Sequence, residues 1–427
     1  MGKKFPNEVL ENIFKHMDAR TLMHSKKVCI RWKEIISKME LMGNLWLDYC
    51  LREIPKCILI DISKLDHDLV ETSKGDIFYH MLSKMGWIFW KEIFKEYVRA
   101  WRVKQDLYVM TTVKYNQDFG QVTALAFNDL VLYSGFENGD VFLWKNLDTG
   151  QKSTKVTDSV YSPVQAIYCN PKGSITSQLQ GIGKKTETLM VVYKDKVKLY
   201  RNEGRKSASN VSQWQWQQEV SRKPCENPHE FCPLPGGHLS SFEWYSGGYI
   251  HQTEETTKRI SVCEDWMDIH ITAAAATKGK IVFGRNSGEV FYISGSSSVT
   301  VLDNLRSRVR QLIIKGKTIL CLTDDSHIHI SANFATFCKL DAHKAFGCHV
   351  ECIAWQASIL VIGTKYGVVH VYHVPTEKSL LDLDLNKSTV IPLNCEHVNA
   401  IAIGDDGSRP VVAVATDTVG IMHVIRW

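Results

Sequence analysis

Two patterns of apolar positions divide the chain. From residue 6 to about residue 104, apolar side chains recur three and four residues apart, which is the spacing of helices. From about residue 107 to residue 427 they alternate in short runs, as in half-buried strands. The change is abrupt and falls near Gln105 and Asp106. The pattern therefore predicts a helical segment followed by an all-β segment.

The first helical stretch begins at Pro6, which suits a first helical position because its missing N–H would have no partner there. Asp18 is a suitable N-cap for a second helix. Periodicity alone predicts that this helix runs from residue 19 to residue 41, because neither Gly nor Pro interrupts it. About fifty residues bury little surface, so an apolar face here is expected to meet a partner.

Residues 5–50 resemble an F-box. The run FPNEVLENIF, a following Leu, the run VCIRW and a Leu-Trp pair have the order and spacing of that family, with Phe5 in place of the commoner Leu. The resemblance divides the predicted helix near Lys26 and Lys27. It implies docking on a Skp-type adaptor and thereby a link to a cullin–RING ubiquitin ligase; a small helical core is the other interpretation. The residues that match adaptor-facing positions are Pro6, Ile13, Leu22, Val28, Cys29 and Trp32.

A helical connector is expected to follow the F-box. From Trp87 to Trp101, apolar residues form one wide stripe on a helix of about 15 residues. A stripe of aromatic residues is typical of packing, so we expect this helix to hold the F-box rigidly against the second domain. The expected domains are 1–54 (F-box), 55–106 (connector) and 107–427 (a β-propeller that resembles WD repeats).

The β segment contains a recurring unit of three strands. In the first unit the second strand ends at a Ser-Gly pair, the turn contains Asn138 and Gly139, and the third strand ends at Trp144. An Asn-Gly pair between alternating apolar runs is a strong hairpin signal. Repeats of this length predict propeller blades. We expect seven blades, with six and eight as alternatives, from units that start near Gln121, Val164, His238, Ile269, Val309, Val350 and Val398.

The units resemble WD repeats in a degenerate form. His238, His349 and His397 match the family's Gly-His position, and Trp144 matches its terminal Trp, which the other units lack at that place. The last unit ends at Trp427 after three strands, and an alternating strand at 107–115 precedes the first unit. That strand is expected to complete the last blade, because closure removes exposed sheet edges.

Charge and composition exclude several function classes. Residues 1–106 carry four more basic than acidic residues and the remainder only one more, a balance that does not predict nucleic-acid binding. No stretch of about 18 apolar residues predicts a membrane span, and no export signal is recognised at the start. The 12 cysteines are therefore expected to be free thiols in a cytoplasmic or nuclear protein.

No catalytic residue, cofactor or metal site is predicted. The run from Gly181 departs from the phosphate-loop pattern at Gln178 and Lys185. Two His and two Cys residues lie between His343 and Cys352, but strand packing is expected to separate their side chains. The chain is therefore expected to be a non-enzymatic subunit.

Substrate binding is expected where the turns between second and third strands meet on one face. Lys194, Arg285 and Lys365 are the basic residues of those turns, and some relatives bind phosphorylated peptides with such residues. An unmodified protein surface is the alternative, and segment 201–237 is a second candidate or a solvated insertion. The function expected is that of a substrate-recognition adaptor of a Skp–cullin–F-box ligase. The alternatives are a scaffold that binds the adaptor without promoting ubiquitylation, and an RNA- or phosphate-binding propeller.

Overall fold

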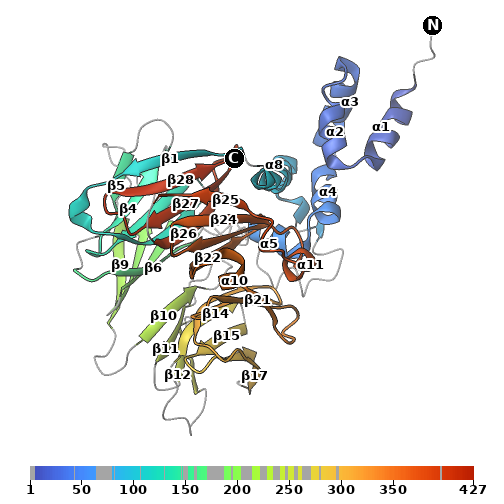
Figure 1. Ribbon diagram of the computed structural model, residues 1–427. Coiled ribbons are helices and arrows are strands. Elements are labelled where there is room, and N and C mark those ends of the chain that lie inside the picture. Colours follow the sequence, from blue (N-terminus) through green and yellow to red (C-terminus); the bar gives the residue numbers. More distant parts are fainter. Residues whose placement is uncertain are drawn as a thin grey trace.

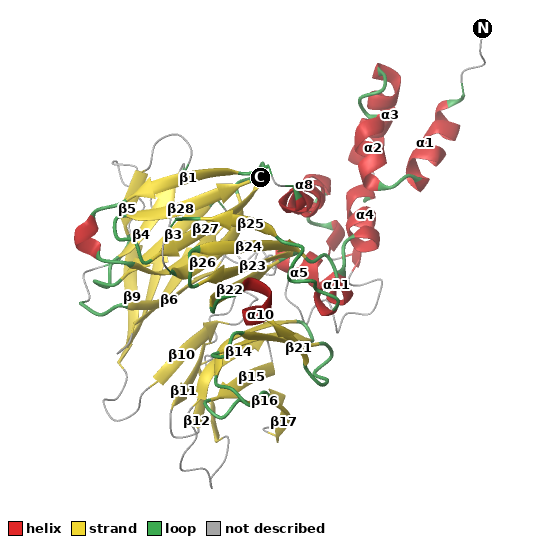
Figure 2. Cartoon of the chain, viewed as in Figure 1, coloured by secondary structure: helices red, strands yellow, loops and turns green. Residues whose placement is uncertain are grey.

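The chain has a helical half and a sheet half (Figures 1 and 2). The helical half ends at Lys104 and the first strand begins at Val109, close to the boundary that the apolar pattern predicts. The computed structural model describes residues 5–42, 44–63, 79–80, 82–105, 107–128, 130–145, 147, 152–157, 161–170, 187–193, 196–202, 214–221, 228–233, 241–245, 249–253, 258–261, 271–277, 280–294, 298–394 and 397–427.

The described part of the helical half contains α1 (Asn7–His16), α2 (Ala19–Ser25), α3 (Ile30–Met42), α4 (Leu45–Glu53), α5 (Lys56–Ser63), α8 (Trp87–Arg99) and the 3-10 helix η1 (Ala100–Lys104). Asp18 caps α2 as predicted, because its carboxylate accepts a hydrogen bond from the backbone N–H of Thr21 at 2.8 Å. The single helix expected from periodicity is wrong, and the division near Lys26 and Lys27 is confirmed.

One apolar core runs through the helical half. Trp46 and Tyr49 of α4 pack against Phe94 of α8, with ring centroids 5.7 and 6.5 Å apart. Leu10 and Phe14 of α1 belong to the same buried cluster. The apolar stripe predicted on α8 therefore covers α4, and the helices before and after residue 54 share their core.

The described residues of the sheet half form seven four-stranded antiparallel sheets. From the first strand to the fourth, they are β2 (Val122–Asn128), β3 (Val131–Phe136), β4 (Val141–Lys145) and β5 (Lys152–Lys155); β6 (Val164–Asn170), β7 (Glu187–Tyr193), β8 (Lys196–Asn202) and β9 (Trp214–Ser221); β10 (Pro228–Pro233), β11 (Ser241–Tyr245), β12 (Tyr249–Thr253) and β13 (Lys258–Ser261); β14 (Ile271–Thr277), β15 (Lys280–Arg285), β16 (Glu289–Ser294) and β17 (Ser298–Asn304); β18 (Val309–Lys315), β19 (Thr318–Thr323), β20 (His327–Ser331) and β21 (Cys338–Asp341); β22 (Val350–Gln356), β23 (Ile359–Thr364), β24 (Val368–His373) and β25 (Thr389–Pro392); and β26 (Val398–Asp405), β27 (Pro410–Thr416), β28 (Ile421–Arg426) and β1 (Val109–Lys114). Between strands lie η2 (Gln117–Phe119), α10 (Ala342–Phe346) and α11 (Glu377–Leu381).

Successive sheets contact one another through their first strands. β2 contacts β6, and the contacts continue through β10, β14, β18, β22 and β26, which in turn contacts β2. A hydrogen bond repeats at these contacts, from the second residue of one first strand to the carbonyl of the first residue of the next. Thr123 donates to Val164 at 2.6 Å, and Thr272 donates to Val309 at 2.6 Å.

Glycines near the ends of second strands permit this close approach. A Cβ at Gly135 would lie 2.4 Å from Val164 Cγ1, and one at Gly284 would lie 2.5 Å from Val309 Cβ. Gly363 has the same relation to Val398, at 2.6 Å from Cγ1. The glycine that recurs at the end of these second strands is therefore where the next sheet packs.

The seventh sheet is completed by a strand from the start of the sheet half. β1 pairs antiparallel with β28, from Val109 opposite Arg426 to Lys114 opposite Ile421. The role predicted for the strand at 107–115 is thereby confirmed. Val113 of β1 is fully buried, which fastens the strand to its sheet.

The third sheet begins earlier than its repeat predicts. Its first strand is β10, upstream of His238, and segment 201–237 carries both β9 and β10. The interpretation of that segment as an insertion is therefore wrong, and Glu254 and Glu255 follow the third strand of their sheet rather than the second. β10 begins and ends with proline and its pairing with β11 shifts in register, so it lacks a regular alternation.

The helical half contacts the sheets at one end only. Its described contacts are with Lys315, Ala357 and Asp405, which lie where first strands lead into second strands. Turns between second and third strands lie at the opposite end of each sheet, because antiparallel strands alternate in direction. We call that opposite end the turn face.

Candidate functional site: an apolar docking surface

Helix α1 presents apolar side chains on two faces. Leu10 and Phe14 are buried in the helical core. Val9 and Ile13 lie four residues apart and are 40% and 42% exposed, so they share the outer face of the helix. The core fixes α1 in place, and this outer face remains open to a partner.

The turn between α2 and α3 adds to the exposed apolar surface. Val28 and Ile30 are 64% and 77% exposed, and Cys29 between them is also exposed. Arg31 fastens this turn to the start of α1, because its guanidinium donates to Asn7 Oδ1 at 3.0 and 2.7 Å and to the carbonyl of Phe5. We call the set of exposed residues at this place the docking surface: Phe5, Pro6, Val9, Ile13, Val28, Cys29 and Ile30.

Two of the predicted adaptor-facing residues have a different environment. Leu22 is fully buried in the helical core, so its side chain offers no surface. Trp32 is half-buried, and its ring lies edge-on to Phe14 with centroids 5.2 Å apart. Sequence reasoning did not single out Val9 and Ile30 as docking residues, although both are apolar neighbours of motif positions in exposed backbone.

A buried carboxylate ties the docking surface to the rest of the helical half. Glu40 of α3 is 3% exposed and lies 2.5 Å from Lys26 Nζ and 2.9 Å from Lys91 Nζ of α8. It also accepts a hydrogen bond from Trp46 Nε1 at 3.2 Å. Burial raises the pKa of the Glu40 carboxyl, but hydrogen bonds from the two lysines outweigh it, so the pKa lies below its usual value. Glu40 is therefore charged at neutral pH.

The predicted substrate-binding residues differ in accessibility. Lys194 lies outside the described residues. Arg285 is only 8% exposed, and its Nη1 lies 2.7 Å from Glu289 Oε2 of the same sheet. Lys365 is exposed at the turn between β23 and β24. These residues lie at the turn face, but Arg285 is engaged within its own sheet.

A group of arginines that the sequence reasoning missed lies near the turn face. Arg306, Arg308 and Arg310 are exposed in the loop that enters β18 and in its first turn of strand. Arg308 lies 3.8 Å from Asp324, and Arg310 is paired with Glu351 of the next sheet. The alternation RSRVR was visible in the sequence, but only the turns between second and third strands were considered.

The described residues contain no group of three His, Cys, Asp or Glu side chains placed to hold a metal. His349 instead contacts Ser326 Oγ at 3.0 Å, and Cys352 Sγ lies 3.6 Å from the carbonyl of Val398. The glycine-rich run at residues 181–186 lies outside the described residues. In the part of the chain that is described, no helix is long and apolar enough to cross a membrane.

Comparisons with known proteins agree with the N-terminal helices. Two solved structures are similar to this chain: BBS1N in complex with ARL6DN, with 12% identity and a TM-score of 0.50 over 74% of this chain and 95% of that one, and the computationally designed Ika8 protein, with 15% identity and a TM-score of 0.48 over 72% and 97%. Identities this low concern the fold alone. No match was found among curated proteins. Residues 3–42 match the F-box domain, which supports an F-box protein.

Proposed function

We propose that this chain is the substrate-recognition subunit of a Skp–cullin–F-box ubiquitin ligase. The F-box match over residues 3–42 and the docking surface carry the proposal. In it, the docking surface binds a Skp-type adaptor, and the sheet half binds the protein to be ubiquitylated. The chain supplies proximity and orientation and no reacting group, in the cytoplasm or the nucleus.

The docking surface has the character of a protein interface. Exposed apolar residues are ordinary when they are scattered, whereas several on one small helical unit mark a binding site. Burial of one large aliphatic side chain contributes up to about 1.5–3 kcal/mol, so a few of them supply the core of an interface. Arg31 holds the two parts of this surface together before a partner arrives.

We further propose that the seven sheets are the blades of a β-propeller related to WD repeats. The successive contacts between first strands and the strand exchange at β1 support this arrangement. In the first sheet, Trp144 Nε1 donates to Ser134 Oγ at 2.7 Å, a buried pair that fits the terminal Trp of a WD repeat. The other members of that network are incomplete, as the degenerate sequence predicts.

The turn face is proposed to bind the substrate. It lies at the end of the sheets away from the helical half, so a bound protein would not contact the docking surface. Lys365 and the loop at 306–310 give this face exposed positive charge, which suits acidic or phosphorylated segments. An unmodified protein surface is the alternative substrate class, because Arg285 and Arg310 are already paired with Glu289 and Glu351.

Substitutions in the docking surface test the proposal. We expect Ile13→Asp and Val28→Asp to weaken capture of a purified Skp-type adaptor by at least about tenfold, or about 1.4 kcal/mol, because each places a carboxylate in an apolar interface. Ile88→Asp is the matched control, since Ile88 is 61% exposed on α8 and lies outside the docking surface. Pro6→Ala with Trp32→Ala is a milder second variant. Capture that is equal for all variants would contradict the docking assignment.

The scaffold alternative is separated by what happens to bound proteins. If the chain delivers substrates, proteins that co-purify with it should become more stable in cells that carry Ile13→Asp with Val28→Asp. If adaptor capture is lost but no such protein accumulates, the scaffold interpretation is favoured. Crosslinking to RNA tests the third alternative, which the sheet half's small charge surplus disfavours.

A further inference from the structure

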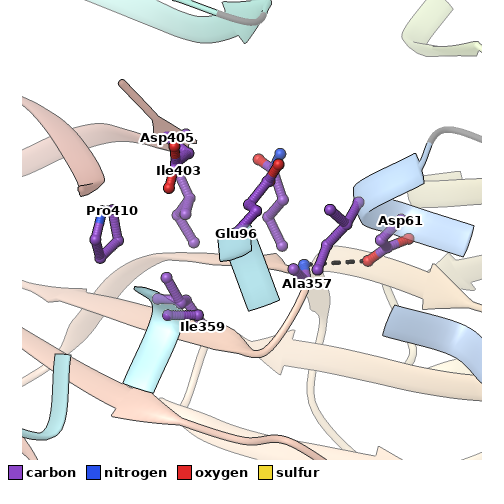
Figure 3. Close-up of a pocket in the computed structure, with 11 residues that line it drawn as sticks. Asp61, Glu96, Ala357, Ile359, Ile403, Asp405 and Pro410 are labelled. Atoms are coloured by element: carbon purple, nitrogen blue, oxygen red, sulfur yellow. Dashed lines mark hydrogen bonds between the residues drawn. The ribbon is translucent and has the colours of Figure 1, made fainter. Parts of the chain in front are cut away.

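The helical half meets the sheets around a hollow. Figure 3 shows this space, which has a volume of about 390 Å³ including its open mouth. Asp61 and Glu96 line it from the helical half, and Ala357, Ile403 and Asp405 line it from the sheets. The apolar packing between the two halves is therefore interrupted, and polar contacts lie at its margins.

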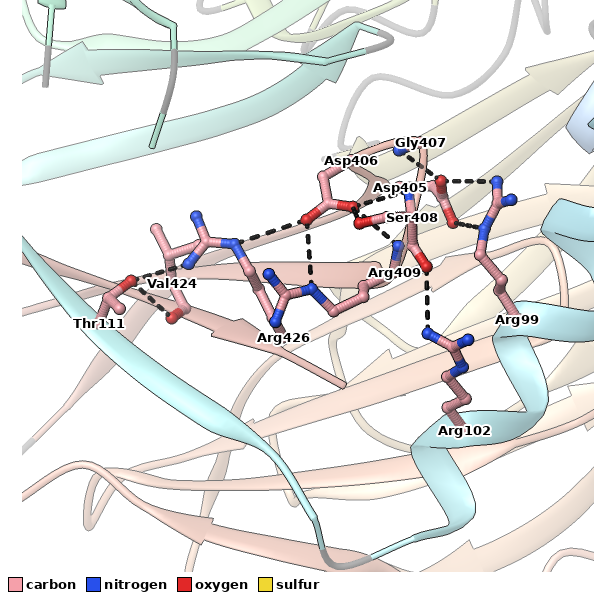
Figure 4. Close-up of polar contacts among 10 residues, drawn as sticks. All are labelled: Arg99, Arg102, Thr111, Asp405, Asp406, Gly407, Ser408, Arg409, Val424 and Arg426. Atoms are coloured by element: carbon pink, nitrogen blue, oxygen red, sulfur yellow. Dashed lines mark hydrogen bonds and ion pairs between the residues drawn. The ribbon is translucent and has the colours of Figure 1, made fainter. Parts of the chain in front are cut away.

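On one side of the hollow, an arginine of α8 binds a carboxylate of the seventh sheet. Arg99 donates from Nε to Asp405 Oδ2 at 3.0 Å and from Nη2 to Oδ1 at 2.8 Å (Figure 4). Both side chains are 12% exposed. A paired geometry of this kind fixes the direction of the guanidinium as well as its distance.

The turn that carries Asp405 is itself held in shape. Asp405 Oδ1 accepts a hydrogen bond from the backbone N–H of Gly407 at 2.7 Å, and Asp406 Oδ1 accepts from the N–H groups of Ser408 and Arg409 at 2.9 and 2.7 Å. Arg102 of η1 donates to the carbonyl of Ser408 at 3.1 Å. The turn therefore presents Asp405 and a carbonyl to the helical half in a fixed arrangement (Figure 4).

On the other side of the hollow, Asp61 of α5 binds two different sheets. Its carboxylate lies 2.5 Å from Lys315 Nζ of the fifth sheet and accepts a hydrogen bond from the backbone N–H of Ala357 of the sixth at 3.1 Å. Lys315 is largely buried, and its Nζ lies 4.4 Å from the centroid of the Trp355 ring. A third contact joins Thr389 Oγ1 of β25 to the carbonyl of Val103 at 2.8 Å.

These contacts lie on three different sheets and enclose the hollow. A single contact between two bodies permits rotation in every direction, and two permit rotation about the line that joins them. Three contacts that do not share a line leave no free rotation. The chain between Lys104 and Val109 is a short tether that limits separation but not angle.

We propose that Arg99 and Asp61 are positioning residues that fix the angle between the docking surface and the turn face. The inference rests on the proposed function, because the angle determines which lysines of a bound protein reach the ubiquitin-carrying enzyme. Arg99 acts through Asp405, and Asp61 acts through Lys315. Neither touches the adaptor or the substrate.

The angle can be measured without the ligase. Spin labels are attached through an introduced keto amino acid at Leu41, which is 66% exposed on α3, and at Lys387, whose side chain is 83% exposed. The unaltered joint should give one narrow distribution of distances, and Arg99→Gln with Asp61→Asn should lose that peak. Exchange of the partners, Arg99→Asp with Asp405→Arg, should restore it in part. An equally narrow peak in the Gln and Asn variant would overturn the proposal.

A matched control separates positioning from general damage. Lys95→Gln removes a charge from α8 at an exposed pair with Glu92 and should leave the peak unchanged. Arg99→Lys keeps one charge and should give an intermediate width. The thermal midpoint and the capture of the Skp-type adaptor should change little in all of these variants, and a large loss of adaptor capture in Arg99→Gln would contradict a role confined to position.

The consequence for ubiquitin transfer is tested with the chain's own lysines as acceptors. In a reaction that contains the full chain, the purified adaptor, the cullin–RING core and ubiquitin with its activating and conjugating enzymes, modified lysines are identified by mass spectrometry. The Arg99→Gln and Asp61→Asn variant should modify a wider set of sheet-half lysines, among them Lys365 and Lys387. An unchanged set would overturn the proposed effect on transfer. No transfer by the unaltered chain would count against the proposed function, while the distance measurement would still decide the joint.

Discussion

Glu40 lies where three helices meet the turn after α2. Its carboxylate is shared by Lys26, Lys91 and Trp46, so it links the docking surface to α4 and α8. A buried charge of this kind costs desolvation and is favourable only while its partners remain. The alignment of the F-box with the connector therefore depends on one side chain.

Replacement of Glu40 tests this dependence. Glu40→Gln should destabilise the helical half by about 2 kcal/mol at neutral pH, because two ammonium groups lose their buried acceptor. Hydrogen exchange of α3, α4 and α8 measures the loss locally. Glu92→Gln is the control, since Glu92 is more than half exposed and pairs with Lys95 at the surface. Equal protection in the two variants would contradict the role of Glu40.

The same residue predicts a dependence on pH. The pKa of Glu40 is lower in the folded chain than in the unfolded chain, so the unfolded state binds the proton more readily. Its contribution to stability is therefore present above the unfolded pKa, near 4.5, and is lost as the pH falls through the lower folded value. The difference between the unaltered chain and Glu40→Gln should shrink in that acidic range.

At this scale the sequence identifies residue types better than environments. Leu22 and Ile13 both match adaptor-facing positions, yet Leu22 is buried and Ile13 is 42% exposed. Which side of a helix faces its own core depends on how the other helices pack, and spacing within one helix does not contain that information. Arg285 illustrates the same limit, because Glu289 of the neighbouring strand takes the charge that was expected to be open.

At the scale of elements, the glycine at the end of a second strand sets how closely two sheets approach. Gly363 faces Val398 of the next sheet with no room for a Cβ between them. Gly135 and Gly284 hold the same place in other sheets, so the requirement repeats along the chain. This makes the contacts between sheets a matter of backbone as much as of side chains.

A side chain at this position should separate two sheets. Gly363→Ala should cost about 1–3 kcal/mol of stability, because the new methyl group overlaps Val398 and also approaches Cys352 Sγ. Urea midpoints measure the loss. In the double variant with Val398→Ala, the combined cost should be smaller than the sum of the two single costs. Simple additivity would show that the overlap is relieved elsewhere.

Elements with regular apolar alternation were predictable, and one without it was not. Six of the seven sheets begin within about two residues of their repeat, because their first strands alternate apolar and polar residues. β10 has proline at both ends and an irregular register, so its unit was placed too late. The break between α2 and α3 likewise needed the resemblance to the F-box, since no Gly or Pro marks it.

At the scale of the whole molecule, the two halves are joined at the same sheet that β1 completes. β1 follows η1 directly, and Asp405 of the joint belongs to the first strand of that sheet. The domain order was predictable from the change of period. The joint was not, because Arg99 and Asp405 are 306 residues apart and no local pattern connects them.

Two valines of β1 test the strand exchange. Val113 is fully buried, whereas Val109 is 55% exposed in the same strand. Val113→Asp should release β1 and raise hydrogen exchange across β28, because an unpaired carboxylate cannot remain buried there. Val109→Asp should leave β28 protected. If the two variants behave alike, β1 does not complete the sheet in solution.

The pairing of β1 with β28 also orders events during synthesis. Thr111 and Val424 bond across 313 residues, so β1 emerges from the ribosome long before its partner exists. At about 5–20 residues per second, this wait lasts on the order of 15–60 s. The helices that precede β1 are complete at that time and can bury their core first. The nascent chain would therefore display a finished adaptor-binding end ahead of an open row of sheets, and a helper that shields edge strands would be needed most in that interval.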